Sequence, residues 1–179
     1  MKKLFVFYIA VFVIMQSCSE KKRDTEEDTP VLLSNMHNKA SCVFLTKDEK
    51  NNPVISWAEV DSAGSKHFYF ANWNEESQQF TPVLTIPIAS NTSIHEEGMP
   101  KIAVKGDGTL VATYETSVPS EKSRFGLSDI QYVMSFDKGR TWTNHQSIQP
   151  ADLHTGTRSC GTIIRLDDGE IGLSWLDTD

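Results

Sequence analysis

The sequence predicts an all-β fold built from repeated antiparallel sheets. Three observations support this class. Three segments of the chain align with one another without gaps, an octapeptide between two expected strands has the residues of a tight turn, and no stretch shows helical periodicity.

The aligned segments each have a turn residue in the middle and an aromatic residue at the end. They cover residues 41–57, 98–114 and 159–175, and their turn residues are Asn51, Gly108 and Gly169. Because Asn and Gly tolerate positive φ, each segment predicts a strand, a tight turn and a second strand. The aromatic residue recurs about every 60 residues, which suits a four-stranded unit with long loops.

Chain order then gives the sheets, or blades. The first is expected over residues 42–85, with later strands at 67–71 and 79–84. The second is expected over residues 99–147, with later strands at 130–134 and 141–148. Residues 160–179 supply two strands of a partial third blade.

The octapeptide from Ser135 to Trp142 fits the pattern S-x-D-x-G-x-x-W at every fixed position. In a turn between two strands, Asp137 accepts backbone N–H groups and the hydroxyl of Ser135 closes the turn. Gly139 supplies positive φ, and Trp142 packs beneath the next strand. The pattern therefore predicts a turn between the third and fourth strands of the second blade.

This motif resembles the Asp box of sialidase-like β-propellers, also called BNR-repeat proteins. A degenerate copy occupies residues 72–77 of the first blade. The resemblance implies an all-β propeller with six blades in the complete protein and about two and a half blades here. We therefore expect an amino-terminal fragment; the alternative is a small, self-sufficient β-sheet domain.

The amino terminus predicts export. Residues 1–18 combine a basic start, an apolar run from Leu4 to Met15 that is too short to span a bilayer, and a serine before Cys18. This end resembles a bacterial lipoprotein signal, which implies a lipid anchor on Cys18 and a place in the cell envelope, in the outer or inner membrane, facing the periplasm or the exterior. A plain secretory signal is the alternative. Residues 19–38 read as a disordered, charged tether, and residues 39–179 as the partial propeller.

Composition limits the partners. The net charge of −7 argues against nucleic acid or an anionic membrane surface, so a small molecule or a glycan is expected. The resemblance implies a glycan or glycoconjugate, with membrane contact only through the lipid anchor. Cys42 and Cys160 occupy equivalent positions in blades that are not adjacent, which predicts two free thiols. No residue spacing indicates a metal site or a cofactor.

The functional face is expected opposite the Asp box. The resemblance implies three arginines that bind a sugar carboxylate, a tyrosine nucleophile activated by a glutamate, and an acidic general acid and base. The first arginine of the family lies in an Arg-Ile-Pro motif, and Gly98 takes its position here.

Five residues on this face are candidates for the site. Glu96, Glu97 and Asp177 are the candidate catalytic residues, and Arg158 and Arg124 the candidate substrate-binding residues. The alternative for Glu96, Glu97 and Arg158 is that they are solvated loop charges or pair with each other, and the alternative for Asp177 is a strand-end charge without a role in the site. Two functions follow: an exported glycosidase of exo-alpha-sialidase-like type that acts on terminal glycan sugars and is inactive as this fragment, or a non-catalytic propeller that binds a glycan or protein.

Overall fold

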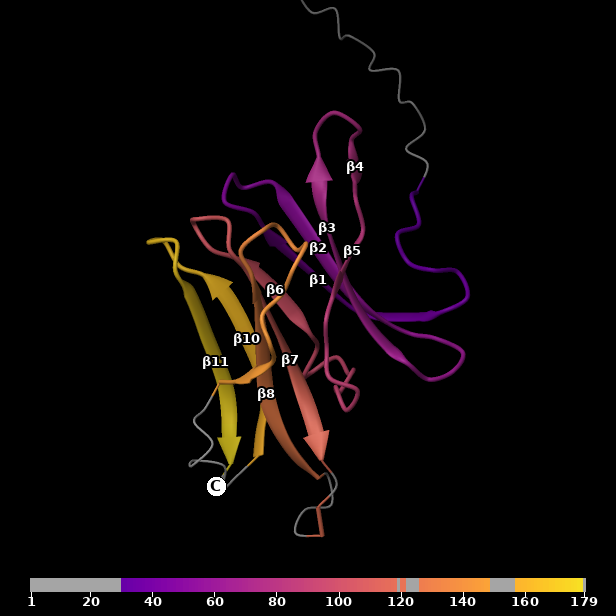
Figure 1. Cartoon of the computed structure of the whole chain (residues 1–179), viewed down its shortest axis with the longest axis vertical. Coiled ribbons are helices and arrows are strands. Elements are labelled where there is room, and N and C mark those ends of the chain that lie inside the picture. Colours follow the sequence, from indigo (N-terminus) through magenta and orange to yellow (C-terminus); the bar gives the residue numbers. More distant parts are fainter. Residues whose placement is uncertain (1–29, 119, 122–125, 149–156, 179) are drawn as a thin grey trace, which may run out of the picture. The chain divides into compact units, whose positions relative to one another are not determined.

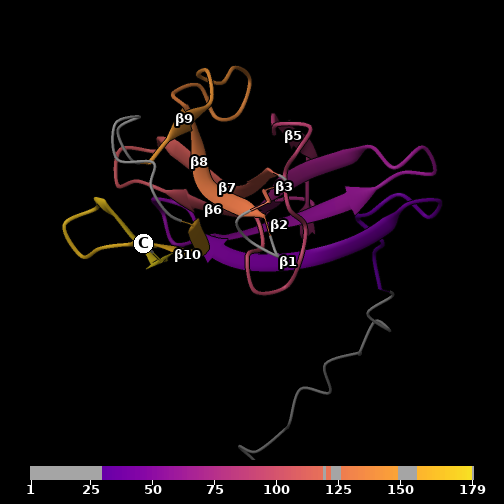
Figure 2. The ribbon, with the colours of Figure 1, turned by 90° about the horizontal axis from the view of Figure 1, so that it is seen from below.

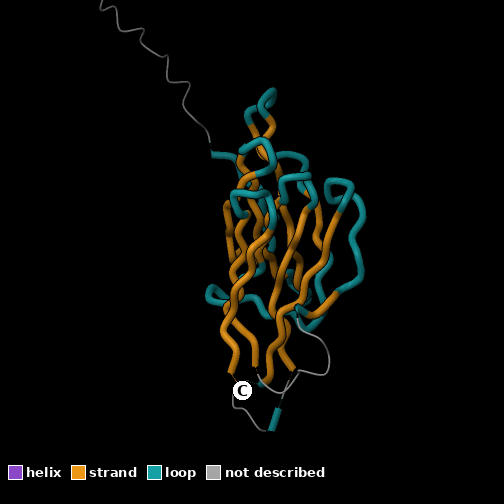
Figure 3. Tube along the Cα trace, turned by 90° about the vertical axis from the view of Figure 1, so that its left-hand side faces the viewer, coloured by secondary structure: helices purple, strands orange, loops and turns teal. Residues whose placement is uncertain are grey.

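A computed structural model describes residues 30–118, 120–121, 126–148 and 157–178. Contacts divide the chain into two units, Met1–Val31 and Leu32–Asp179, and every described strand lies in the second unit. This described part holds strands and loops only, as Figures 1 and 3 show. Within it, no helix has the length and apolar character needed to cross a membrane.

The first sheet follows chain order. It contains β1 (Lys39–Lys47), β2 (Pro53–Val60), β3 (Lys66–Asn74) and β4 (Gln79–Phe80), all antiparallel, while β5 (Leu84–Ile86) also pairs with β3. The expected last strand at 79–84 is thus split into two short strands. Pro82 lies between them and has no N–H group to donate to a ladder.

The second sheet repeats the same order with β6 (Lys101–Val104), β7 (Leu110–Val118), β8 (Leu127–Ser135) and β9 (Gln146–Ser147). The third contains β10 (Thr157–Arg165) and β11 (Ile171–Thr178). The strand expected at 141–148 is present only as the two residues of β9, because the Asp-box loop occupies the preceding residues.

The expected all-β class is confirmed. Its curled antiparallel sheets, seen from below in Figure 2, are consistent with a β-propeller-like fold. A blade number for the complete protein and a sialidase-type propeller stay predictions.

The three hairpin turns have the predicted backbone. Asn51, Gly108 and Gly169 have φ values of 69°, 86° and 87°. The turns also contact one another: the N–H of Gly106 donates to Gly169 O at 2.8 Å, and Arg165 Nη1 donates to Asp48 O at 2.6 Å. All three hairpins therefore lie at the same end of the sheets.

The main core lies between the first two sheets. Phe68 and Phe70 of β3 and Ile86 of β5 pack with residues of the second sheet, including Ile102 and Tyr114. Each of these side chains is at most 1 % exposed. Burial of this apolar surface is the main term that holds the two sheets together.

The Asp box forms the predicted turn. Ser135 Oγ donates to Asp137 Oδ1 and accepts the N–H of Gly139, both at 2.8 Å. Asp137 accepts the hydroxyl of Thr141 at 2.6 Å and the N–H groups of Arg140 and Thr141. These bonds, led by the Thr141 hydroxyl, lower the pKa of Asp137 to about 2.

The same turn also docks onto the first sheet. Trp142 meets Phe70 edge to face, with ring centroids 6.2 Å apart. Gly139 has φ 86°, and a Cβ there would lie 2.5 Å from Phe70 Cζ. Glycine is thus required both for the turn and for the close packing of two sheets.

Candidate functional site

Strand register separates two ends of the sheets. Ser135 of the Asp box pairs with Leu110, beside the second hairpin. At the opposite end, Lys39 pairs with Val60, Val118 with Leu127, and Thr157 with Thr178. We call this opposite end, together with the loop of residues 92–100 that leads into β6, the rim.

Buried charge is concentrated toward the rim. Among the described residues, four charged side chains belong to buried residues: Glu59, Lys101, Glu115 and Arg158, at 2 %, 8 %, 7 % and 2 % exposure. Glu59 and Glu115 lie near the ends of β2 and β7, and Lys101 and Arg158 near the starts of β6 and β10. Buried charges are costly, so their concentration at one end of a fold indicates a candidate site.

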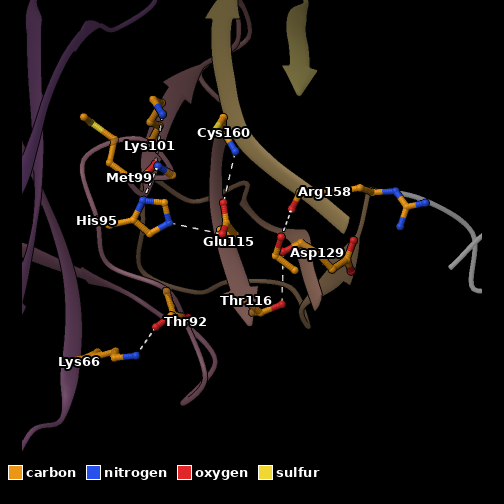
Figure 4. Close-up of polar contacts among 12 residues, drawn as sticks. Lys66, Thr92, His95, Met99, Lys101, Glu115, Thr116, Asp129, Arg158 and Cys160 are labelled. Atoms are coloured by element: carbon orange, nitrogen blue, oxygen red, sulfur yellow. Dashed lines mark hydrogen bonds and ion pairs between the residues drawn. The ribbon is translucent and has the colours of Figure 1, made fainter. Parts of the chain in front are cut away.

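Glu115 is the central carboxylate of the rim in Figure 4. Its Oε1 lies 3.4 Å from His95 Nε2, and its Oε2 accepts the N–H of Cys160 at 3.3 Å. Its backbone carbonyl accepts the N–H of Ser93 at 2.7 Å. This one residue therefore connects the loop before β6, strand β7 and strand β10.

Sequence reasoning missed Glu115, although a signal was present. It directly follows the repeat aromatic Tyr114, and the equivalent residues in the other two segments are Ala58 and Leu176. A carboxylate at a repeat position that is otherwise apolar indicates a special role.

Glu96 and Glu97 lie in the turn immediately before Gly98, and both side chains are exposed. The structure therefore places them at the rim, close in sequence to His95. Their proposed catalytic roles stay predictions.

Arg158 and Asp177 lie opposite each other on β10 and β11. Arg158 Nε is 3.3 Å from Asp177 Oδ2; the arginine side chain is 2 % exposed and the aspartate side chain 36 %. The structure thus brings together two of the predicted site residues as an ion pair. Such a pair could hold the Asp177 carboxylate in place at the rim, and it places Arg158 beneath the surface rather than on it.

Lys101 lies between two β-bulges, one at Cys42 in β1 and one at Cys160 in β10. Its Nζ donates to Gly161 O at 2.8 Å and to Met99 O at 3.2 Å. Burial lowers the pKa of Lys101, and the neighbouring thiols of Cys160 and Cys42 and the Glu115 carboxylate partly oppose this shift.

Cys42 and Cys160 are the bulged residues, with φ of 57° and 56°, and both thiols are free as expected. Burial raises the pKa of the Cys42 thiol. A protonated, buried thiol is unreactive, so Cys42 serves packing at the bulge.

Glu59 has a structural role. It accepts the indole N–H of Trp57 at 2.8 Å, the amide of Asn38 at 2.7 Å and the N–H of Asn35 at 3.1 Å. Burial alone would raise the pKa of Glu59, but these hydrogen bonds together lower it. Asn35 and Asn38, which the sequence assigns to the end of the tether, thus contact a strand residue more than 20 positions away.

Tyr114 is unsuited to act as a nucleophile. Its hydroxyl contacts His145 Nδ1, and burial raises its pKa to about 12. A phenol buried in the core between two sheets is a packing residue with one satisfied polar atom.

Two predicted residues, Arg124 and Cys18, lie outside the described residues. In the part of the chain that the structure describes, no group of three or more His, Cys, Asp or Glu side chains is arranged to hold a metal ion.

No family model and no curated protein sequence matches the chain. Among solved structures, it is similar to an endo-arabinase from Bacteroides thetaiotaomicron VPI-5482, with a TM-score of 0.53 and 14 % identity over 82 % of this chain and 55 % of that chain. A protein of unknown function from Dyadobacter fermentans DSM 18053 aligns with 12 % identity and a TM-score of 0.47, over 83 % of this chain and 54 % of that one. The chain thus spans about half the length of these structures. At such identity, the likeness to the endo-arabinase concerns the fold.

Proposed function

We propose that the chain belongs to a glycan-active protein of glycoside hydrolase type, with its site at the rim. The observation that carries this proposal is the position of the four buried charged residues, all toward one end of the sheets and away from the hairpins. Exposed Glu96 and Glu97 lie at the same end and supply carboxylates within reach of solvent. Paired carboxylates are the groups that most glycosidases use for acid and base catalysis.

The fold likeness supports a glycan as substrate. The similar structure is that of an endo-arabinase, a glycoside hydrolase. Fold alone does not fix function, so an arabinan is only one candidate substrate beside the terminal sialosides that the Asp-box resemblance implies.

A binding function without catalysis is the second candidate. Both ring nitrogens of His95 have partners in the chain, Gly98 N at 3.1 Å and Glu115 Oε1 at 3.4 Å. A histidine held in this way is not free to exchange protons with a substrate, which favours a role in building a binding surface.

The test compares cleavage and binding. The purified protein, with any residues that its gene encodes after residue 179, is incubated with arabinan, other neutral polysaccharides and sialyl-lactose, and new reducing ends and released sialic acid are measured beside the dissociation constants. We expect the double variant Glu96→Gln/Glu97→Gln to lose cleavage by at least a hundredfold, as general acid–base groups contribute about 10²–10⁴ in rate. Glu76→Gln, an exposed glutamate beyond the hairpin end of β3, is the matched control.

Each outcome separates the candidates. Cleavage that depends on Glu96 or Glu97 supports the hydrolase. Saturable binding without cleavage supports the binding module. A folded protein of that full length that neither binds nor cleaves any glycan would overturn both.

We also propose that the protein is exported and anchored by a lipid on Cys18. The support is the sequence alone: a basic start, a short apolar run and a serine before the cysteine. Expressed in a bacterium with labelled palmitate, the chain should carry the label in the membrane fraction, and Cys18→Ala should abolish it. Export of an unlabelled wild-type chain would instead support a plain secretory signal.

A further inference from the structure

One histidine, His95, connects the turn of residues 95–98 to strand β7. The N–H of Gly98 donates to His95 Nδ1 at 3.1 Å, which makes Nδ1 the acceptor and leaves the proton on Nε2. That Nε2 faces Glu115 Oε1 at 3.4 Å (Figure 4). We call these three residues, Gly98, His95 and Glu115, the clasp.

The clasp fixes a carboxylate just below the surface. The Glu115 side chain is 8 % exposed, whereas that of His95, which lies beside it, is 42 % exposed. The N–H of Cys160 at 3.3 Å holds the other carboxylate oxygen. The Glu115 carboxylate is therefore held in one place by contacts to both of its oxygens.

Residue 98 is a glycine because a side chain would not fit there, not because of its backbone conformation. It is not among the glycines with positive φ, so other residues could adopt its backbone. A Cβ at this position, however, would lie 2.5 Å from Glu115 Oε2 and 2.7 Å from the His95 ring. Any side chain at residue 98 would push the carboxylate or the imidazole out of place.

Among the described residues near the clasp, two lysines donate to backbone carbonyls. Lys101 is 8 % exposed and donates to the carbonyls of Met99 and Gly161. Lys66 donates to the Thr92 carbonyl. The exposed charges of the turn itself are the carboxylates of Glu96 and Glu97.

We propose that the clasp makes the rim selective for uncharged sugars and excludes sugars that carry a carboxylate. This inference rests on the proposed function and names its substrate class. A carboxylate on the sugar would meet the fixed charge of Glu115 and the exposed charges of Glu96 and Glu97, with no room at residue 98 for a cationic side chain. Glu115 acts here through its charge, and it also holds the turn that carries Glu96 and Glu97.

The test uses pairs of sugars that differ in charge and otherwise only by a methyl group. Binding by the purified chain is measured for neutral oligosaccharides, and for 3′-sialyllactose and trigalacturonate, each as the free acid and as the methyl ester. We expect neutral sugars or methyl esters to bind at least about tenfold more tightly than free acids at low salt, and the difference to shrink as salt screens the charges.

Glu115→Gln keeps the shape and removes the charge. It should shift the ratio of acid to ester affinity by about tenfold toward the acid. Glu76→Gln should leave that ratio unchanged. A role for Glu115 in folding alone would weaken acid and ester equally, which distinguishes it from a role in selectivity.

Two results would overturn the inference while leaving a glycan function intact: free acids that bind as well as their esters, or a Glu115→Gln variant with an unchanged ratio. If that variant does not fold, the salt dependence of the wild-type chain decides. A folded wild-type chain that binds no glycan would instead overturn the proposed function, and the inference with it.

Discussion

At the scale of single residues, two separate demands require a glycine at position 139. Its φ of 86° belongs to the left-handed region, and the space where a Cβ would lie is filled by Phe70 of another sheet. The motif pattern predicted the first demand, since the pattern describes a turn. The second demand depends on which sheet lies beside the turn, so only the folded chain reveals it.

Gly139→Ala should therefore destabilise the fold by about 3 kcal/mol, from backbone strain together with overpacking. Gly64→Ala is the matched control, because Gly64 has φ 82° but nothing within 4 Å of the new Cβ. The control should lose only about 1 kcal/mol. Urea unfolding followed by tryptophan fluorescence measures both, and equal losses would contradict the docking role of the Asp box.

Asp137 makes the Asp box sensitive to acid. Its pKa is lowered from 3.8 to about 2 in the folded protein, so its contribution to stability is present above pH 4 and is lost as the pH falls toward 2. Asp137→Asn does not titrate at this position. The stability difference between wild type and variant should hence be largest near pH 6 and shrink between pH 4 and 2. Urea midpoints measured across this range test it, and a constant difference would count against the hydrogen-bonded carboxylate.

At the scale of elements, the hairpins were the best predicted feature and the short outer strands the worst. The turn residues Asn51, Gly108 and Gly169 carry a local backbone requirement that sequence displays directly. The lengths of β6 and β9 depend instead on where loops leave the ladder. Residues 98–100 and 141–145, which the repeat alignment and the expected last strand assign to strands, lie instead in the loop before β6 and in the Asp-box loop.

Contacts between hairpins also tie the third sheet to the first. Arg165 reaches from β10 to Asp48 O at 2.6 Å and to Asn51 Oδ1 at 3.1 Å. Arg165→Ala should cost about 1–2 kcal/mol, because two hydrogen bonds from a charged donor are lost. Amide hydrogen exchange should accelerate in β10 and β11 more than in β6 to β8. Arg140→Ala, at an exposed residue of the Asp-box turn, serves as the control and should leave both exchange rates unchanged.

At the scale of the folded unit, both flanks expose apolar side chains. Val43 and Leu45 of β1 are 59 % and 62 % exposed, and Ile164 of β10 and Leu176 of β11 are 56 % and 61 % exposed. Each pair lies on one face of its sheet. Within the described part of the chain, β11 pairs with β10 alone, so no strand pairs with its other edge.

These flanks should make the isolated chain associate. We expect its mean mass in sedimentation velocity to rise with concentration, because apolar faces and open strand edges pair with one another. Leu45→Lys combined with Ile164→Lys should reduce the association. Phe136→Lys, an equally polar change at a residue 72 % exposed on the Asp-box turn, should not. A wild-type chain that stays monomeric throughout would contradict the prediction.

The sequence by itself determined the all-β class, the three hairpins and the Asp-box turn, because these follow from the local backbone preferences of glycine, asparagine and aspartate. It also identified Arg158 and Asp177 as candidate site residues, but it did not indicate that they form an ion pair, and it missed Glu115. Only the tertiary structure decided the ion pair and the place of Glu115, since Glu115 meets His95 and Cys160 across separations of 20 and 45 residues. Such contacts depend on how sheets pack together, and neither spacing nor periodicity records that.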